Sequence, residues 1–509
     1  MSLKISKIIA SIFLYCLVIM AYAKDISYDY TYDEITYDNL KSYIESKQYP
    51  TIKLSENYGV FIKEKREKDY SRNIMTKFYR GKICRGLFIT SCNRNLENIE
   101  KYTGVNLDDE DSLFESGIYN VRGYKVSYLT PDMNGKPRQV SGAVIIPDSE
   151  KPLKGVVVMY HYTVLDKKNI PSNFNKDATH YSEIISATLA SKGYAVVAPD
   201  YLGYGDDESS VHPYVLYPEV NALSGIYMLK GFESSFAKKL NFEKTIDNKT
   251  KLYMSGFSEG SAYVLWAAKI LQDNPSYLNY NGYKLIKLAP VSGAYNISKV
   301  LLDYLIESNE YGYGFQQSAM LKATRPGLFA DVMSSYATYS FGGNESAVFS
   351  EKFANCNDSL VESGSCSISK LINMQRSELA KYNAILDAAE KAGYARDNVS
   401  VLPLANPDIL QNKDFLAQLK YADIYNWKPD VDIDLITMEK DFIVPPLNTY
   451  TAYVSMKEHG AENVRLIMIP NDEFWFDGFI PFTHLDVNHP TFIPLSALFA
   501  RNSFAESSE

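Results

Sequence analysis

Eight apolar, strand-like segments divide the chain from Gly117 onward, and helix-like or polar sequence fills the intervals between them. The first two segments, residues 119–130 and 138–147, lie close together and alternate partly between apolar and polar positions. This pattern predicts an antiparallel hairpin at a sheet edge. The other six are continuous apolar runs, typical of parallel strands covered on both faces. They span residues 154–163, 193–201, 251–258, 284–295, 431–441 and 464–472.

The intervals between these segments carry helical periodicity. Residues 180–193 precede one predicted strand, and residues 261–271 follow another. Strands that alternate with helices predict the α/β class, here a mostly parallel eight-stranded sheet with helices on both faces and right-handed crossovers. One long interruption, residues 297–429, separates the sixth and seventh strands. We predict that it forms a helical cap inserted between two parts of the sheet domain, residues 117–296 and 430–509.

The N-terminus has the pattern of an export signal. Lys4 and Lys7 precede an apolar run that ends in Ala21-Tyr22-Ala23, a small-residue pattern that signal peptidase cuts. The run is shorter than the roughly 20 residues that span a bilayer, so an uncleaved anchor is the weaker interpretation. Residues 1–23 are therefore predicted to be a signal peptide, and the mature chain to be secreted or periplasmic. Residues 24–116 form a polar, Tyr-rich N-terminal extension without recognisable chemistry.

The cysteine residues agree with export. Cys16 would leave with the signal peptide, and four cysteines remain as two close pairs, Cys84 with Cys92 and Cys356 with Cys366. An even number of cysteines in an exported chain favours disulfides, and the local pairing is the most economical of the three connectivities. Four free buried thiols are the alternative. No histidine pair stands beside them at zinc-site spacing, so no metal site is expected.

Composition and charge exclude some classes of function. The 509 residues include 61 acidic and 52 basic side chains, for a net charge of −9, and no long basic run occurs. Such a chain lacks the basic patch that binds the phosphates of a nucleic acid, so nucleic-acid binding is not expected. The hydrophobic fraction of 46% is ordinary for a globular protein, which excludes disorder for most of the chain.

The clearest chemical signal is the segment GFSEG at residues 256–260. It lies between a predicted strand and a predicted helix, the context in which a G-x-S-x-G turn exposes its serine as a nucleophile. A serine hydroxyl is a weak nucleophile on its own and needs a base that is oriented by an acid. Ser258 is therefore the predicted nucleophile.

The base is predicted to follow the last strand, since strand-to-helix nucleophile sites have the order serine, acid, histidine. The chain has only six histidines: His161, His180, His212, His459, His484 and His489. Of these, His484 and His489 follow the last strand, whereas His459 falls on a helical stretch before it. We favour His489, because it begins a loop that turns into the terminal helix, and we keep His484 as the alternative.

The acid is expected just beyond the seventh strand, where Asp441 follows an apolar run and precedes two prolines. Glu439 is its rival at the strand end. Acyl transfer also requires donors for the developing oxyanion. One is predicted to be the backbone N–H of Glu259, the residue after the nucleophile. The other should come from the turn after residues 156–160, which holds His161, Tyr162 and Thr163, and we assign it to Tyr162.

Taken together, these motifs resemble the α/β-hydrolase superfamily, and within it the secreted lipases and esterases with a large cap. The motifs are YHYT at Tyr160, APDYLGYGD at Ala198 with HPY at His212, GFSEGS at Gly256 and EKDFIVP at Glu439, and the resemblance covers about residues 117–503. It implies hydrolysis of a carboxylic ester through an acyl-enzyme, with neither metal nor organic cofactor. The chain departs from the usual His-Gly-Thr loop, because Tyr162 occupies the glycine position.

The resemblance leaves the substrate open between lipids and short or medium acyl esters. The cap suggests possible transient contact with a lipid surface, and the oligomeric state stays open. A serine peptidase is one alternative, with Glu259 or the acidic cluster at residues 206–208 as an anchor for a peptide terminus. A catalytically inactive binding module is another, and the presence of all three triad residues argues against it.

Overall fold

The computed structural model divides the chain into two compact units, Met1–Lys47 and Gln48–Glu509. It describes residues 37–47, 58–71, 119–164, 166–175, 181–276, 282–306, 315–354, 404–439, 443–469 and 492–506, together with the single residues 55, 384, 385, 387 and 441. The described part of the first unit is helix α2 (Tyr37–Ser46). All other elements belong to the second unit. The predicted signal peptide and all five cysteines lie outside the described residues, so these predictions stay untested.

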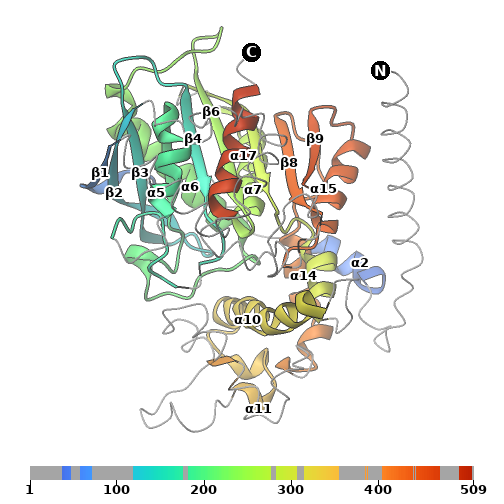
Figure 1. Cartoon of the computed structure of the whole chain (residues 1–509). Coiled ribbons are helices and arrows are strands. Elements are labelled where there is room, and N and C mark those ends of the chain that lie inside the picture. The colour runs from blue at the N-terminus through green and yellow to red at the C-terminus, as the bar shows by residue number, and fades with distance from the viewer. Residues whose placement is uncertain are drawn as a thin grey trace. The chain divides into compact units, whose positions relative to one another are not determined.

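A nine-stranded sheet forms the centre of the second unit (Figure 1), in the order β1-β2-β3-β5-β4-β6-β7-β8-β9. The strands are β1 (Phe61–Tyr70), β2 (Asn120–Pro131), β3 (Pro137–Asp148), β4 (Gly155–Tyr160), β5 (Tyr194–Pro199), β6 (Thr250–Phe257), β7 (Tyr283–Val291), β8 (Asp432–Met438) and β9 (Val464–Ile469). Strands β2 and β3 form the predicted antiparallel hairpin, and β5, β4, β6, β7, β8 and β9 run parallel. All eight predicted strands are present, so the predicted fold class is confirmed.

The ninth strand, β1, was not predicted. It lies within the predicted N-terminal extension and pairs antiparallel with β2 at the sheet edge. Its sequence, FIKEKREKDY, is dense in charge because most of its side chains face solvent. Charged side chains on an edge strand prevent pairing with other chains. A strand without an apolar face gives no periodic signal, which explains why sequence patterning missed it.

Helices cover both faces of the sheet. On one face, α6 (Pro218–Ser235), α7 (Glu259–Asp273) and α15 (Leu447–Glu458) contribute to one apolar core; on the other, α5 (Tyr181–Thr188) and α17 (Phe492–Glu506) contribute to a second. Strands β4 and β5 are buried along their whole length between these layers, as expected for central parallel strands. Short 3₁₀ segments span Ala190–Lys192, Gly205–Asp207, Ala237–Lys239, Glu345–Ala347 and Ile409–Gln411.

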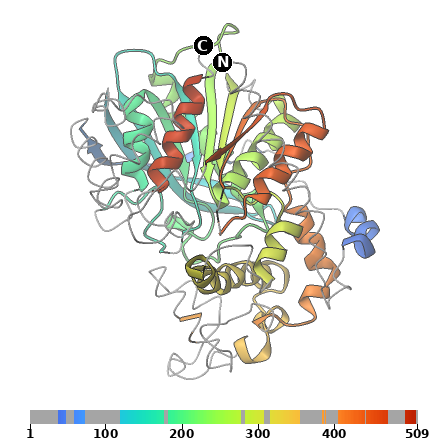
Figure 2. The same cartoon turned by 45° about the vertical axis from the view of Figure 1, so that its right-hand side comes forward.

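The predicted cap interval lies between β7 and β8, two strands that pair directly in the sheet. Its described elements are the π-helix η4 (Ile297–Leu301), α9 (Leu302–Ile306), α10 (Phe315–Ser340), α11 (Glu351–Ala354) and α14 (Lys413–Tyr421). Figures 1 and 2 show α10 and α11 beside one end of the strands rather than over a sheet face. In the described part of the chain, no helix has the length and apolar character needed to cross a membrane.

A buried ionic cluster joins three strands to the last helix. Asp434 of β8 lies 2.9 Å from Lys287 Nζ of β7 and 2.7 Å from Arg465 Nε of β9, and it accepts a hydrogen bond from Ser503 Oγ of α17. Burial alone would raise the pKa of Asp434, but the contacts with Arg465, Ser503 and Lys287 outweigh it, so the pKa is lowered. The cluster fixes α17 to the sheet.

The substitution Asp434→Asn is expected to lower the free energy of unfolding by about 3 kcal/mol at pH 7, since it leaves the buried Lys287 cation without its counter-charge. Urea denaturation measures the change. The matched control is Asp273→Asn, which breaks the exposed pair between Lys269 and Asp273 and should cost at most about 0.5 kcal/mol. Because the pKa of Asp434 is lowered, its contribution should be present above about pH 4 and disappear as the pH falls through the lowered pKa. Equal effects of the two variants would refute a structural role of the cluster.

Candidate active site

Ser258 lies on a strained turn between β6 and α7. Its φ of 55° and ψ of −120° are unusual for a residue with a side chain. The turn is held by its backbone, since the Ser258 N–H donates to the carbonyl of Val291 at 2.9 Å. Ser261 adds a clamp, as its Oγ donates to Gly256 O or Val291 O and accepts from the Val291 N–H. The predicted nucleophile therefore lies in a backbone conformation that the surrounding structure imposes.

The two glycines of the GFSEG motif allow this turn to close. A Cβ atom on Gly256 would lie 2.5 Å from the carbonyl group of Gly260. A Cβ atom on Gly260 would lie 2.4 Å from the carbonyl oxygen of Tyr160, at the end of β4. Neither position has room for a side chain, so both glycines are required by close backbone approach. The first turn of α7 consequently packs directly against the loop that follows β4.

Strained residues collect at this edge of the sheet. Four described residues other than glycine have positive φ, and three of them follow the ends of adjacent or nearby strands: Tyr201 after β5, Ser258 after β6 and Ser292 after β7. Such conformations concentrate at functional sites, where packing holds them in place. The carboxyl edge of the parallel strands is also where ligands bind in open α/β sheets.

Asp441 lies at the same edge, just beyond β8. The sheet register aligns Phe257 of β6 with Val291 of β7, and Val291 with Ile436 of β8. The segments that carry Ser258 and Asp441 therefore leave the sheet on the same side, two strands apart. Asp441 is fully buried, and its Oδ1 accepts the backbone N–H groups of Ile443 at 3.0 Å and Val444 at 2.9 Å.

The backbone of the rival acid, Glu439, has a different role. Its N–H donates to the carbonyl of Ile469 at 2.9 Å and so continues the pairing of β8 with β9. Asp441 is thus the carboxylate that is buried beyond the strand and oriented by two backbone donors, which is the environment expected of a triad acid. The assignment of Asp441 remains a prediction that this geometry favours.

The predicted base, His489, and its alternative, His484, both lie outside the described residues, so the choice between them stays open. Three described histidines were set aside as bases. His459 is the C-cap residue directly after α15, and its Nδ1 contacts the Ser455 carbonyl at 2.7 Å. His161 is fully buried between two backbone carbonyls, with Nδ1 2.7 Å from Tyr162 O and Nε2 3.0 Å from Asp200 O. The third, His212, has a role described below.

The predicted oxyanion donors lie on adjacent segments. Glu259 is the first residue of α7, a position where the backbone N–H has no partner within the helix. Tyr160 of β4 pairs with Gly256 of β6, so Tyr162 and Glu259 follow neighbouring strand ends. The Tyr162 ring is buried against Tyr181 and Phe257 and points into the core beside β6. The side chain that replaces the usual glycine therefore packs inside the protein.

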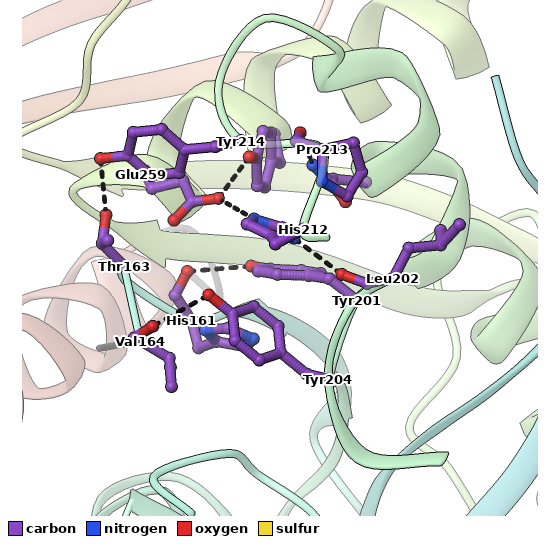
Figure 3. A network of polar contacts seen from close by, with 12 residues as sticks. His161, Thr163, Val164, Tyr201, Leu202, Tyr204, His212, Pro213, Tyr214 and Glu259 are labelled. Atoms are coloured by element: carbon purple, nitrogen blue, oxygen red, sulfur yellow. Dashed lines mark hydrogen bonds and ion pairs between the residues drawn. The ribbon is translucent and has the colours of Figure 1, made fainter. Parts of the chain in front are cut away.

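The side chain of Glu259 takes part in a buried polar network that the sequence analysis did not foresee (Figure 3). Its Oε1 lies 2.6 Å from Nε2 of His212 and also accepts a hydrogen bond from the Tyr263 hydroxyl. The other nitrogen of His212, Nδ1, lies 2.7 Å from the carbonyl oxygen of Leu202. Burial raises the pKa of Glu259, but His212 and Tyr263 oppose this effect, and the net pKa is lowered.

Aromatic rings pack around this network. The His161 ring stacks on Tyr201 with centroids 3.9 Å apart, and Tyr201 in turn stacks on His212 at 5.8 Å. Burial lowers the pKa of His161 to about 4, so this histidine is neutral at pH 7. The sequence narrows the choice of partner for Glu259 but does not identify it. A glutamate directly after a buried nucleophile needs a partner, and few histidines are available.

Comparisons with known proteins bear on the fold. Two crystal structures align over most of the chain. One is a protein of Legionella pneumophila, with TM-score 0.61, 18% identity and coverage of 88% of this chain and 98% of that one. The other is the rice cell wall degrading esterase LipA of Xanthomonas oryzae, with TM-score 0.57, 19% identity and coverage of 84% and 94%. The chain has the α/β-hydrolase fold.

Sequence comparisons match a shorter part of this chain. Residues 168–279 match the family model of secretory lipases, a segment that includes both His212 and Ser258. A secreted triacylglycerol lipase of Malassezia furfur is 26% identical over 188 residues. That match spans 35% of this chain and 37% of the lipase. Among the described residues, no group of acidic, histidine or cysteine side chains is arranged to hold a metal ion.

Because the backbone of Ser258 is strained, replacing Ser258 with glycine should have an unusual effect on stability. Glycine adopts positive φ without a Cβ penalty, whereas alanine retains the strain of serine. Ser258→Gly should therefore be more stable than Ser258→Ala by about 1 kcal/mol, as measured by urea denaturation. At ordinary backbone positions, glycine is the less stable of the two residues. If Ser258→Gly were the less stable variant, the turn would not be strained.

Proposed function

We propose that this protein is a secreted serine hydrolase that cleaves carboxylic esters through an acyl-enzyme. The main support is the strained turn that presents Ser258 at the carboxyl edge of the sheet, on the same side as the buried carboxylate of Asp441. The family model of secretory lipases matches the segment around this turn. No step of the proposed reaction requires a metal or an organic cofactor.

The proposed mechanism assigns one role to each residue. His489 accepts the proton of the Ser258 hydroxyl as the oxygen attacks the ester carbonyl, and Asp441 orients the imidazole and stabilises its cation. The backbone N–H groups of Glu259 and Tyr162 donate to the oxyanion. Collapse of the tetrahedral intermediate releases the alcohol, which takes the proton from His489. Water then attacks the acyl-enzyme by the same route and releases the carboxylic acid.

The charges near the site favour an ester over a peptide. A peptidase that removes terminal residues needs a charged group to bind the peptide terminus. Glu259 is instead paired with His212. Asp206 lies 2.8 Å from Lys125 Nζ, and Asp207 forms an ion pair with Arg138. Three of the four proposed anchors, Glu259, Asp206 and Asp207, are thus paired with cations of the protein, which weakens the peptidase alternative.

The substrate is proposed to be an ester of a lipid or of a short or medium acyl chain. The matched relative from Malassezia furfur is a secreted triacylglycerol lipase, which supports lipid esters. The insertion between β7 and β8 is proposed to act as the cap that bounds the acyl site and contacts lipid surfaces. Among its described aromatic side chains, Tyr304, Phe329 and Tyr336 are buried in packing contacts and hold the cap together, whereas Phe341 is exposed.

Export of the protein is also part of the proposal. Residues 1–23 carry the features of a cleavable signal, and both sequence comparisons are to secreted lipases. In an oxidising compartment, Cys84 and Cys92, and Cys356 and Cys366, would form two local disulfides. The mature enzyme is proposed to act in the periplasm or outside the cell.

Hydrolysis of p-nitrophenyl esters over a series of acyl chain lengths tests the reaction. Ser258→Ala and His489→Ala should abolish turnover, since each removes a group that takes part in bond formation. His484→Ala should retain it. Loss of activity in His484→Ala with survival of His489→Ala would reassign the base and keep the reaction. A folded wild-type protein that hydrolyses no ester would refute the proposed function.

The acid is tested by a pair of amide substitutions. Asp441→Asn should lower kcat by about 10³–10⁴-fold. An amide no longer holds the catalytic histidine in the tautomer that accepts the serine proton, and it does not stabilise the imidazolium cation. Glu439→Gln is the matched control and should change kcat by less than about threefold, since its backbone, not its side chain, continues the sheet. The reverse ranking of the two variants in the ester assay would transfer the role of acid to Glu439.

A further inference from the structure

The residue after the nucleophile is a buried glutamate, which is an electrostatic problem for the proposed reaction. The side chain of Glu259 is almost fully buried, and its backbone N–H belongs to the proposed oxyanion hole. Negative charge develops on the substrate oxygen during attack, and a low-dielectric site magnifies charge interactions. An uncompensated carboxylate at this position would oppose the reaction. The protein therefore has to supply a cation close by.

The contacts of His212 show how this charge is balanced. Its Nδ1 lies 2.7 Å from the Leu202 carbonyl, which only accepts hydrogen bonds, so Nδ1 carries a proton. Its Nε2 lies 2.6 Å from Glu259 Oε1, an atom that also accepts from the Tyr263 hydroxyl. A second proton is therefore placed between Nε2 and Oε1. The arrangement is an imidazolium paired with a carboxylate, with no net charge.

We propose that His212 and Glu259 form a charge-compensated positioning pair, which fixes the peptide after Ser258 and cancels the carboxylate charge beside the oxyanion. The two paired side chains do not touch the reacting atoms, so they act through the backbone N–H of Glu259 and the nucleophile turn. This inference rests on the proposed ester hydrolysis. It goes further by giving a role to two side chains that the serine, histidine and aspartate mechanism does not use.

The other titratable groups around Glu259 do not replace His212. His161, from the loop after β4, is neutral at pH 7 because burial lowers its pKa to about 4. Four tyrosines surround the carboxylate and remain neutral, since burial raises the pKa of each well above 10: Tyr201 and Tyr204 from the loop after β5, Tyr214 from the segment before α6, and Tyr263 of α7. Asp331 of α10 adds further negative charge near Tyr204 and Tyr214.

The segment that carries His212 also contacts the insertion between β7 and β8. Tyr339 of α10 donates a hydrogen bond to the Val211 carbonyl, and Ser340 Oγ lies 2.9 Å from the Tyr217 hydroxyl. Gln418 of α14 donates to the Leu216 carbonyl at 2.5 Å. The segment is thus held by the insertion on one side and by Glu259 on the other. The positioning pair therefore connects the nucleophile turn to the proposed cap.

The test uses His212→Asn, Glu259→Gln and the double variant in the full mature chain. Asparagine can place an amide N–H near the position of Nδ1 and keep the Leu202 contact, but it cannot reach Glu259. This variant should lower kcat roughly 100-fold, comparable to loss of an oxyanion donor, while KM changes less than about threefold. In Glu259→Gln, the amide donates to neutral His212, and kcat should fall about threefold.

The double variant gives the decisive comparison. Once glutamine replaces the unpaired carboxylate, kcat should recover about tenfold relative to His212→Asn alone, because the opposing charge is gone. A double variant no more active than His212→Asn would overturn charge compensation, and so would a loss expressed in KM alone. His459→Asn is the matched control for a histidine distant from the pair, and it should retain wild-type kcat.

Urea denaturation separates failure of this inference from failure of the proposed function. In His212→Asn, the unpaired buried carboxylate should have a raised pKa, so the folded state holds a proton that the unfolded state has released. The stability of this variant should therefore rise relative to the double variant as the pH falls from 8 to 5. Equal pH dependence of the two variants would overturn the pair, even in a protein without ester turnover.

Discussion

The close backbone approach between the start of α7 and the ends of β4 and β6 is the constraint on which the candidate site depends. Gly256 and Gly260 permit this approach, and the clamp made by Ser261 and the Val291 carbonyl holds Ser258 at positive φ. A strained residue persists only when its surroundings over-determine it. The buried parallel strands supply that rigidity, because both of their faces are covered by helices.

The chemistry at this edge follows from the sheet topology. The carboxyl ends of parallel strands lie at the same edge of the sheet, so residues that are distant in sequence come together there. Ser258 follows β6 and Asp441 follows β8, and the backbone N–H groups beyond β8 orient the Asp441 carboxylate. The Asp434 cluster connects β7, β8, β9 and α17, and it keeps the last helix in register with the sheet.

Polar side chains from separate loops contact one another beside the nucleophile. The carboxylate of Glu259 is neutralised by His212 and hydrogen-bonded by Tyr263, and the His161 ring stacks on Tyr201. A buried charge of this kind is tolerated only with its partner in place. Because the segment of His212 also contacts α10 and α14, the electrostatics of the nucleophile turn and the packing of the insertion depend on the same residues.

The apolar runs by themselves determined the eight predicted strands, the helices on both faces and the position of the nucleophile turn, since burial leaves periodic patterns. The strand β1 left none, because an edge strand exposes its side chains. The sequence also proposed Ser258 and Asp441, which the sheet register then brought to one edge. The pairing of His212 with Glu259 was decided by tertiary structure alone. These residues are 47 positions apart, and no local pattern encodes which buried charges will meet when separate loops converge.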